Sequence, residues 1–169
     1  RIYDRALDDE AVRALFNEKA PPRGGIVGTV GDDVITPWAV SAGVTGGAPG
    51  AGADVIDGLA GNDVLAGGDG TDTIDGGAGR DTVVYSYTLS DLAVDLDAET
   101  VEVVGTGRIE TVRDVENVVA GAGDDVLRGD DADNRFTGGD GTDRFDGRGG
   151  SDTVVYQNGD WTVTLVDEV

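Results

Sequence analysis

The chain has 169 residues, and its 12 Lys plus Arg against 34 Asp plus Glu give a formal net charge of −22. This charge argues against binding to nucleic acid or to an anionic membrane surface. The chain contains no Cys, Met or His, which excludes disulfides, most zinc and haem sites, and catalysis by Ser/His or Cys/His pairs. Metal ions that prefer oxygen ligands remain, and the abundance of Asp beside Gly favours Ca²⁺. No apolar run reaches the roughly 18 residues of a membrane-spanning helix, so we expect no membrane insertion.

Residues 1–20 predict a strand end followed by a short helix. Ile2 and Tyr3 suit a strand, Asp8 is a suitable N-cap, and Pro21 ends the helix. A lone helix of this length is marginal in water, so we expect it to pack on something outside this chain. The letters RIYDRAL and the acidic helix start resemble the end of concanavalin-like (laminin-G-like) jelly-roll domains. The resemblance implies that residues 1–20 are the C-terminal remnant of such a domain in a longer protein, joined by a Pro/Gly linker at 21–27.

From Gly28 the sequence repeats every nine residues. Four repeats occupy 49–84 and four more occupy 120–155, with one outlying repeat at 28–36 before a 12-residue insertion at 37–48. The two runs are offset by 71 positions and both end in DTVVY, so the region is internally duplicated. The sixth place of each repeat is acidic, apart from one Asn: Asp33, Asp54, Asp63, Asp72, Asp81, Asp125, Asn134, Asp143 and Asp152.

Two further segments alternate apolar and polar residues. Leu92, Val94 and Leu96 do so between the runs, within 85–119, and residues 161–166 do so after the second run. This pattern predicts half-buried strands. We expect them to be antiparallel strands that cover the ends of each stack of repeats, because an open stack would expose unpaired edges.

The repeats fit the pattern G-G-x-G-x-D-x-U-x, where U is a large apolar residue. Over roughly 28–156 the chain resembles the RTX (repeats-in-toxin) family, whose calcium-binding repeat has this pattern. The resemblance implies an all-β fold, a parallel β-roll in two blocks, 28–119 and 120–169, each with its capping strands. The apolar eighth place faces inward in such a roll, which here selects Ile35, Ile56, Leu65, Ile74, Val83, Leu127, Phe136, Phe145 and Val154.

Glycines at places one, two and four permit left-handed backbone, and such turns can point carbonyls at one spot while the Asp adds a carboxylate. In the family, calcium lies between turns of alternate repeats. One turn supplies carbonyls at places two and four plus its Asp, and the next supplies carbonyls at places one and three plus its Asp. The resemblance therefore implies three sites: Gly50, Gly52 and Asp54 with Gly67, Asp69 and Asp72; Leu59, Gly61 and Asp63 with Gly76, Ala78 and Asp81; and Gly121, Gly123 and Asp125 with Gly138, Asp140 and Asp143.

Two more sites depend on departures from the pattern, so we expect about three to five ions in total. If the insertion adds three residues to a coil, the outlying repeat stacks on the first of the run, which joins Thr29, Gly31 and Asp33 to Pro49, Ala51 and Asp54. The other site joins Asp130, Ala132 and Asn134 to Gly147, Gly149 and Asp152. There Ala replaces a turn glycine and neutral Asn replaces Asp, so we expect weak binding or no ion. Acids on outward places, namely Asp32, Asp57, Asp75, Asp124 and Asp146, are expected to be solvated.

Rows of carboxylates repel one another without metal, so we predict a non-catalytic module that folds when calcium binds. Resemblance to the RTX family implies a secreted bacterial protein, exported by the type I secretion machinery and folded outside the cell. An alternative is a module that binds polysaccharide or a cell surface. An exposed stripe of Arg135, Arg144 and Arg148 would favour it, as would sugar stacking on Trp38 or Trp161, although such Trp residues more often pack as caps.

Overall fold

The computed structural model describes residues 25–155 and 164–165. The helix expected within 1–20 and most of the strand expected at 161–166 lie outside these residues. Within them the structure is all-β, with no helix and therefore none that is long and apolar enough to cross a membrane. The strands of the first run and the outlying repeat are β1 (Ile26–Val27), β2 (Val34–Thr36), β3 (Ala39–Val40), β4 (Val55–Asp57), β5 (Val64–Leu65), β6 (Thr73–Asp75) and β7 (Thr82–Val84).

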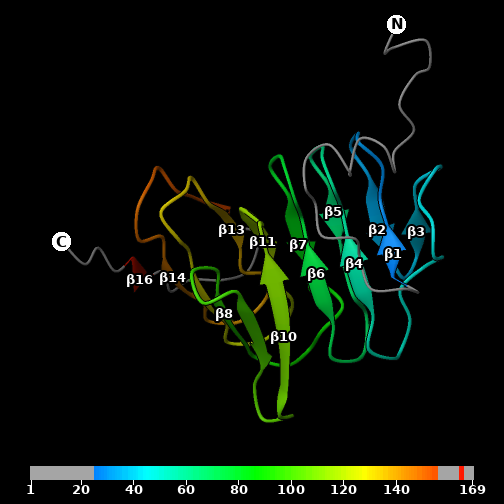
Figure 1. Cartoon of the computed structure of the whole chain (residues 1–169). Coiled ribbons are helices and arrows are strands. Elements are labelled where there is room, and N and C mark those ends of the chain that lie inside the picture. Colours follow the sequence, from blue (N-terminus) through cyan, green and yellow to red (C-terminus); the bar gives the residue numbers. More distant parts are fainter. Residues whose placement is uncertain (1–24, 156–163, 166–169) are drawn as a thin grey trace, which may run out of the picture.

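The remaining strands continue the same architecture. They are β8 (Leu92–Asp95), β9 (Thr100–Val103), β10 (Arg108–Arg113), β11 (Asn117–Val119), β12 (Val126–Arg128), β13 (Arg135–Thr137), β14 (Arg144–Asp146), β15 (Thr153–Val155) and β16 (Thr164–Leu165). Successive repeats place their strands alternately in two sheets, of order β1-β4-β6-β10-β9-β8-β12-β14-β16 and β15-β13-β11-β7-β5-β2-β3. The strands succeed one another across the molecule (Figure 1). The predicted parallel β-roll is confirmed.

The core is the space between the two sheets. Ile35, Ile56, Leu65, Ile74, Val83, Leu127 and Phe136 are fully buried, Phe145 is 3% exposed, and Val154 packs on them while partly buried. Every eighth-place residue therefore faces inward, as predicted. The strands that carry these residues are two or three residues long and contribute one such side chain each, so this part of the apolar core is thin and regular. Branched and aromatic residues suit these positions because they pack well on a pleated surface.

The segment between the two runs forms part of both sheets. Strand β9 is antiparallel to both β8 and β10, as expected, but β10 also pairs in parallel with β6, and β8 pairs in parallel with β12. In the other sheet β11 lies between β7 and β13, parallel to both. The segment thus pairs with β6, the last strand of the first run in the nine-stranded sheet, and with β12, the first strand of the second run in that sheet. Both sheets run without interruption from one block to the other, and the expected boundary at 119/120 remains a prediction.

The insertion at 37–48 does not take the place of a repeat in the stack. Strand β3 folds back antiparallel on β2, and β2 pairs in parallel with β5, with Ile35 opposite Leu65. Strand β4 pairs instead with β1 and β6. The prediction that the repeat at 28–36 stacks on the repeat at 49–57 is therefore wrong. The insertion lies between β2 and β4, so it does not lengthen the turn 28–33, which stacks on the turn 58–63.

A buried carboxylate holds the middle segment against the first block. Glu110 on β10 is completely buried, accepts a hydrogen bond from the Tyr85 hydroxyl at 2.6 Å, and forms an ion pair with Arg108 at 2.5 Å. Arg108 also lies 3.8 Å from Asp69 in the neighbouring turn. A buried charge is tolerated only when it is paired and hydrogen-bonded. Burial and the adjacent carboxylate raise the pKa of Tyr85 well above its ordinary value, so the phenol stays protonated and continues to donate.

Candidate metal centre

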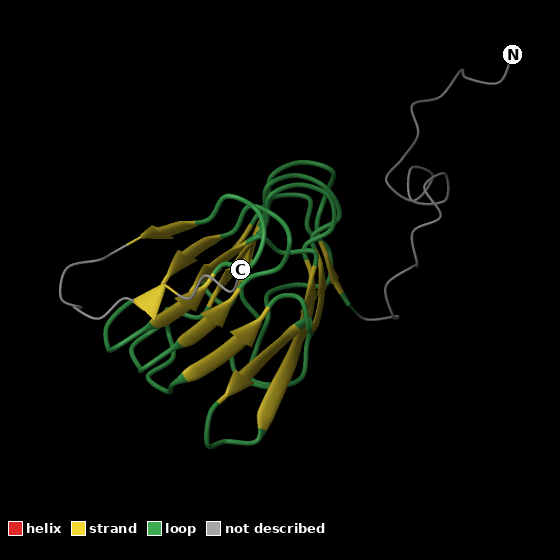
Figure 2. Cartoon of the chain, turned by 90° about the vertical axis from the view of Figure 1, so that its left-hand side faces the viewer, coloured by secondary structure: helices red, strands yellow, loops and turns green. Residues whose placement is uncertain are grey.

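The turns that carry the glycines lie directly over one another. Ala60 pairs in parallel with Ala78, and Ala122 with Asp140, each residue being at the third place of its turn. Two repeats therefore make one coil, and turns on the same edge recur every second repeat. Figure 2 shows these turns as stacked loops beside the sheets. The three principal pairs of turns predicted from the sequence are brought together.

The sixth-place residues form rows linked by one recurring hydrogen bond. The backbone N–H of each donates to the Oδ1 atom of the sixth-place residue in the next coil. Distances are 2.9 Å from Asp54 to Asp72, 2.7 Å from Asp63 to Asp81, 3.0 Å from Asp125 to Asp143, and 2.9 Å from Asn134 to Asp152. Asp33 donates in the same way to Asp63 at 2.7 Å. Asp33 therefore lies over Asp63 and not over Asp54, because the insertion keeps its turn on the other edge.

The second carboxylate oxygen of several of these residues has no protein partner. The Oδ2 atoms of Asp63, Asp72, Asp81 and Asp125 are buried and accept no hydrogen bond. Buried polar atoms are almost always hydrogen-bonded, and an unpaired buried charge is costly. Four such oxygens at the predicted ligand positions fit a bound cation.

Electrostatics at these residues supports the same interpretation. The pKa of Asp63 is raised to about 6, chiefly by burial and also by the charges of Asp81 and Asp33, while the hydrogen bond from the Asp33 N–H lowers it. Burial likewise raises the pKa of Asp125 to about 7, against the lowering effect of the Leu92 N–H and with the charge of Asp143. The carboxylates thus resist ionisation at these positions. A divalent cation between them would offset both the free-energy cost of burying their charges and their mutual repulsion.

The first-place glycines are required by close packing and not by an unusual φ. At Gly58, Gly67 and Gly138 an added Cβ would lie less than 3.0 Å from the carboxylate of the same repeat. Positive φ angles occur instead at places two and four, such as 92° at Gly77 and 151° at Gly79. The expectation of strained backbone at place one is therefore wrong. At the other two places it holds in several turns, but not at Gly50, Gly52, Gly121 or Gly123, which lack a positive φ.

The carbonyls at places two and four point toward the next turn. An added Cβ at Gly70 or Gly79 would collide with the fourth-place carbonyl oxygen of the preceding turn. In the Leu59 turn, the Leu59 carbonyl accepts the Ala78 N–H at 2.8 Å and the Ala78 carbonyl accepts the Gly61 N–H at 2.9 Å. Each carbonyl has a second lone pair that a cation can use. No group of three or more acidic side chains converges within the described part of the chain, so backbone carbonyls would supply most ligands.

The comparison with known families agrees with this geometry. The family of RTX calcium-binding nonapeptide repeats matches the chain in four copies, over residues 49–83 and 119–154. These segments belong to that family. No curated protein matches the chain. The matched RTX segments contain all the residues of the three principal sites, and the chain is accordingly a calcium-binding module.

The repeat at 28–36 lies outside the matched segments, yet it has the same turn. Asp33 Oδ2 accepts the Thr29 N–H at 2.5 Å, just as Asp54 Oδ2 accepts the Gly50 N–H at 2.8 Å. Of its six proposed ligands, Thr29, Gly31 and Asp33 face the repeat of Asp63, whereas Pro49, Ala51 and Asp54 belong to the other edge.

The RTX turn with Ala132 and Asn134 is formed, but its chemistry differs. Asn134 Oδ1 accepts the Asp130 N–H at 3.0 Å, and its amide donates to the Glu116 carbonyl at 3.3 Å. Its coil still stacks on the repeat of Asp152. The neutral amide leaves one carboxylate where the other sites have two, and weak calcium binding here remains a prediction.

Sequence reasoning missed a second ladder at the fifth place of the RTX turns. Asp32 accepts the Asn62 N–H at 2.8 Å, and Asp124 accepts the Thr142 N–H at 2.8 Å. Both acids are exposed, as expected, and each also accepts a backbone N–H from the next coil. Asp or Asn at place five is the sequence feature that could have predicted these hydrogen bonds, because a short polar side chain there reaches the backbone of the next coil.

Sequence reasoning also missed Glu116, which lies outside any repeat. Because Asn117 on β11 is opposite Thr82 on β7, Glu116 is opposite Asp81, in the sixth-place position of the row. Its Oε2 atom accepts the Asp81 N–H at 2.8 Å. No nonapeptide glycine accompanies it, so only the strand pairing identifies it.

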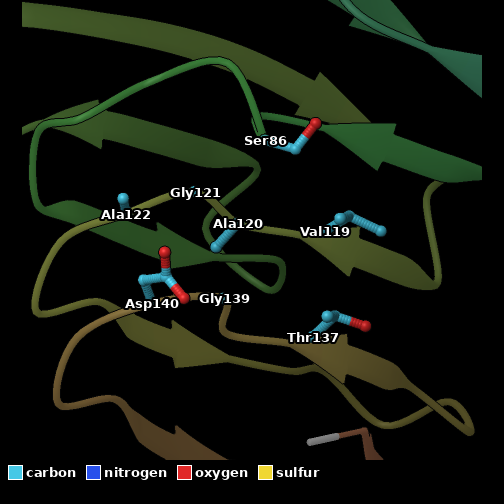
Figure 3. A pocket seen from close by; sticks show the side chains of 8 residues that line it. All are labelled: Ser86, Val119, Ala120, Gly121, Ala122, Thr137, Gly139 and Asp140. Carbon is cyan, nitrogen blue, oxygen red and sulfur yellow. The ribbon is translucent and has the colours of Figure 1, made fainter. Parts of the chain in front are cut away.

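One small pocket, of ≈190 Å³, borders the third site where the chain leaves β11 and β13. Figure 3 shows Gly121, Ala122, Gly139 and Asp140 on one side and Ser86 on another. Asp140 is the only charged residue in its lining. The pocket is thus an extension of the calcium turns and presents no converging set of catalytic groups.

Proposed function

We propose that this RTX module folds when it binds calcium outside the cell, and that it thereby stabilises the C-terminal region of a secreted bacterial protein. The observation that carries the proposal is the set of buried, unpaired carboxylate oxygens on Asp63, Asp72, Asp81 and Asp125. These oxygens stabilise the folded chain only when a cation occupies the gap between turns.

The charge balance favours folding coupled to binding. Five Ca²⁺ ions carry +10 and would reduce the formal net charge from −22 to −12. Each coil buries only two eighth-place side chains, which is little apolar surface to offset the repulsion of the acid rows. Calcium that binds only the folded chain adds its binding free energy to the free energy of folding. The chain then remains unfolded in cytoplasm, where calcium is scarce, and folds where calcium is plentiful.

Membership of the RTX family supports the rest of the proposal. A chain kept unfolded until export suits passage through the type I secretion machinery, which we infer as its partner. The jelly-roll-like residues 1–20 would place a polysaccharide-binding, polysaccharide-cleaving or adhesive domain before the roll.

Circular dichroism of the whole chain tests the proposal. We expect a β spectrum in excess calcium and a largely unfolded spectrum after chelation with EGTA, reversed by adding calcium again. Magnesium at the same concentration serves as the control, because it keeps its waters and fits carbonyl-rich sites poorly. A β spectrum that survives chelation would contradict calcium-dependent folding.

An alternative function is binding of polysaccharide or a cell surface by the module itself. Trp38 favours it, being 59% exposed, although its ring also packs edge-on against Tyr87 at 5.7 Å. The arginine stripe does not form, because Arg135 and Arg144 lie on different sheets and Arg148 pairs with Asp95. A glycan array probed with the calcium-loaded chain and with the Trp38→Ala variant tests this alternative. It requires that the chain binds a glycan and that the variant loses this binding.

A further inference from the structure

The row that begins at Asp33 does not end with the first block of repeats. It continues through Asp63 and Asp81 to Glu116, which lies on the short connection between β10 and β11. This connection has three residues, 114–116, in place of the six-residue turn of a repeat. Its contacts with the preceding turn nevertheless match those of the repeat-to-repeat steps.

Three contacts define an ordinary step of this row, as between Asp63 and Asp81. The Asp63 N–H donates to the Asp81 carboxylate at 2.7 Å, and the Asp63 carbonyl accepts the N–H of Thr82 at 2.8 Å. An added Cβ at Gly58 would lie less than 3.0 Å from both Asp63 Oδ2 and the carbonyl oxygen of Gly76. The last contact shows that a carboxylate oxygen and a first-place carbonyl of the next turn converge on one point.

The step from Asp81 to Glu116 has all three contacts. The Asp81 N–H donates to Glu116 Oε2 at 2.8 Å, and the Asp81 carbonyl accepts the Asn117 N–H at 2.9 Å. An added Cβ at Gly76 would lie less than 3.0 Å from both Asp81 Oδ2 and the carbonyl oxygen of Asp114. Asp114 thus takes the role of the first-place residue, and its φ of 48° turns the chain sharply enough to do so.

The Asp81 side chain is completely buried, and its Oδ2 atom, which points to this spot, has no hydrogen-bond partner. The other row of the first block ends differently. There the corresponding residue is Glu110, and Arg108 already supplies the cation. Among the described residues no arginine forms an ion pair with Glu116.

We propose that Glu116 and the carbonyl of Asp114, together with the turn of Asp81, form an additional calcium site that joins the two blocks of repeats. By the rule of the repeats, the Asp81 turn contributes the carbonyls of Gly77 and Gly79 and its carboxylate. The connection contributes one carbonyl and the Glu116 carboxylate. These five oxygens fall one short of the usual minimum of about six for Ca²⁺, and water commonly completes such a set. The site rests on the proposed calcium binding of the repeats.

Glu116→Gln in the whole chain tests the site. The amide oxygen can still accept the Asp81 N–H, so the stack is kept while the ligand charge is lost. Calcium bound at saturation is counted by equilibrium dialysis, with circular dichroism to verify the fold. We expect one ion fewer than in the wild type, or one ion bound at least about tenfold more weakly. Glu102→Gln is the matched control, because Glu102 is exposed on β9 of the same segment, and we expect it to bind as the wild type does.

Glu116→Asp provides a second test that does not depend on tolerance of the amide. It keeps the charge but shortens the reach by one methylene, so we expect the full ion count with one weakened ion. Unchanged count and affinity in both Glu116 variants would overturn the site while leaving calcium binding by the repeats intact. A wild-type chain that binds no calcium would instead overturn the proposed function itself.

Discussion

At the scale of single residues, the nonapeptide glycines serve two different needs. Glycines at places two and four provide positive φ, as at Gly77, whereas the first-place glycine leaves room for the carboxylate that folds back over it. Leu59 and Arg148 show that a side chain is tolerated at place two, at φ of 76° and 60°. At Gly58 and Gly67 an added side chain would displace the carboxylate oxygens of the predicted calcium sites, although Pro49 and Ala120 occupy place one in the first repeat of each run.

Gly58→Ala should therefore destabilise the calcium-loaded module. An added Cβ would collide with Asp63 Oδ2 and the Gly76 carbonyl, so we expect a loss of about 1–3 kcal/mol, typical of overpacking, and weaker calcium binding. Gly50→Ala is the control, because nothing lies within 4 Å of its added Cβ and the substitution keeps the carbonyl that is the predicted ligand. Urea unfolding in excess calcium measures both, and equal stability of the two variants would contradict this role of place one.

At the scale of elements, the insertion at 37–48 forms an edge strand and leaves the alternate stacking of the turns unchanged. Strand β3 folds on β2 and completes the edge of the seven-stranded sheet, while the repeat at 28–36 remains on the edge of Asp63 and Asp81. Asp63 consequently lies in two successive steps of its row, and Asp54 in one. The segment between the two runs also affects the sheets, because its strands β10, β9 and β8 join the parallel strands of both runs in one sheet.

A double-mutant cycle tests this stacking order. In excess calcium, Asp33→Asn and Asp63→Asn should be coupled by about 0.5–3 kcal/mol in unfolding free energy, because the two residues are hydrogen-bonded and we expect them to bind one ion. The parallel cycle of Asp33→Asn with Asp54→Asn should be additive to within about 0.5 kcal/mol. Coupling of Asp33 to Asp54 and not to Asp63 would restore the stacking predicted from the sequence.

At the scale of the whole molecule, the two blocks form one continuous roll. The nine-stranded sheet crosses between them through β10, β9 and β8, and the seven-stranded sheet crosses through β11. Pairing in both sheets means that neither block can lose its structure without exposing an edge of the other. The blocks should therefore fold as one unit.

Small-angle scattering during a calcium titration tests this expectation. The radius of gyration should fall in a single transition from about 43 Å, expected for an unfolded chain of this length, toward about 15 Å, expected for a compact one. An elongated roll would give a somewhat larger final value. Two separate transitions at different calcium concentrations would instead show that the blocks fold independently.

The roll could be predicted from the nine-residue period. An apolar eighth place and a sixth-place carboxylate predict short strands in two sheets, with rows of acidic residues at the turns. Periodicity therefore predicted the core from Ile35 to Val154 and the pairing of Asp54 with Asp72, Asp63 with Asp81 and Asp125 with Asp143. The positions of residues that do not follow the period could be found only from the folded structure. The position of Asp33 depends on which edge receives the insertion, and that of Glu116 on the register of β11 against β7. Both are set by strand pairing between residues distant in sequence, which no local pattern records.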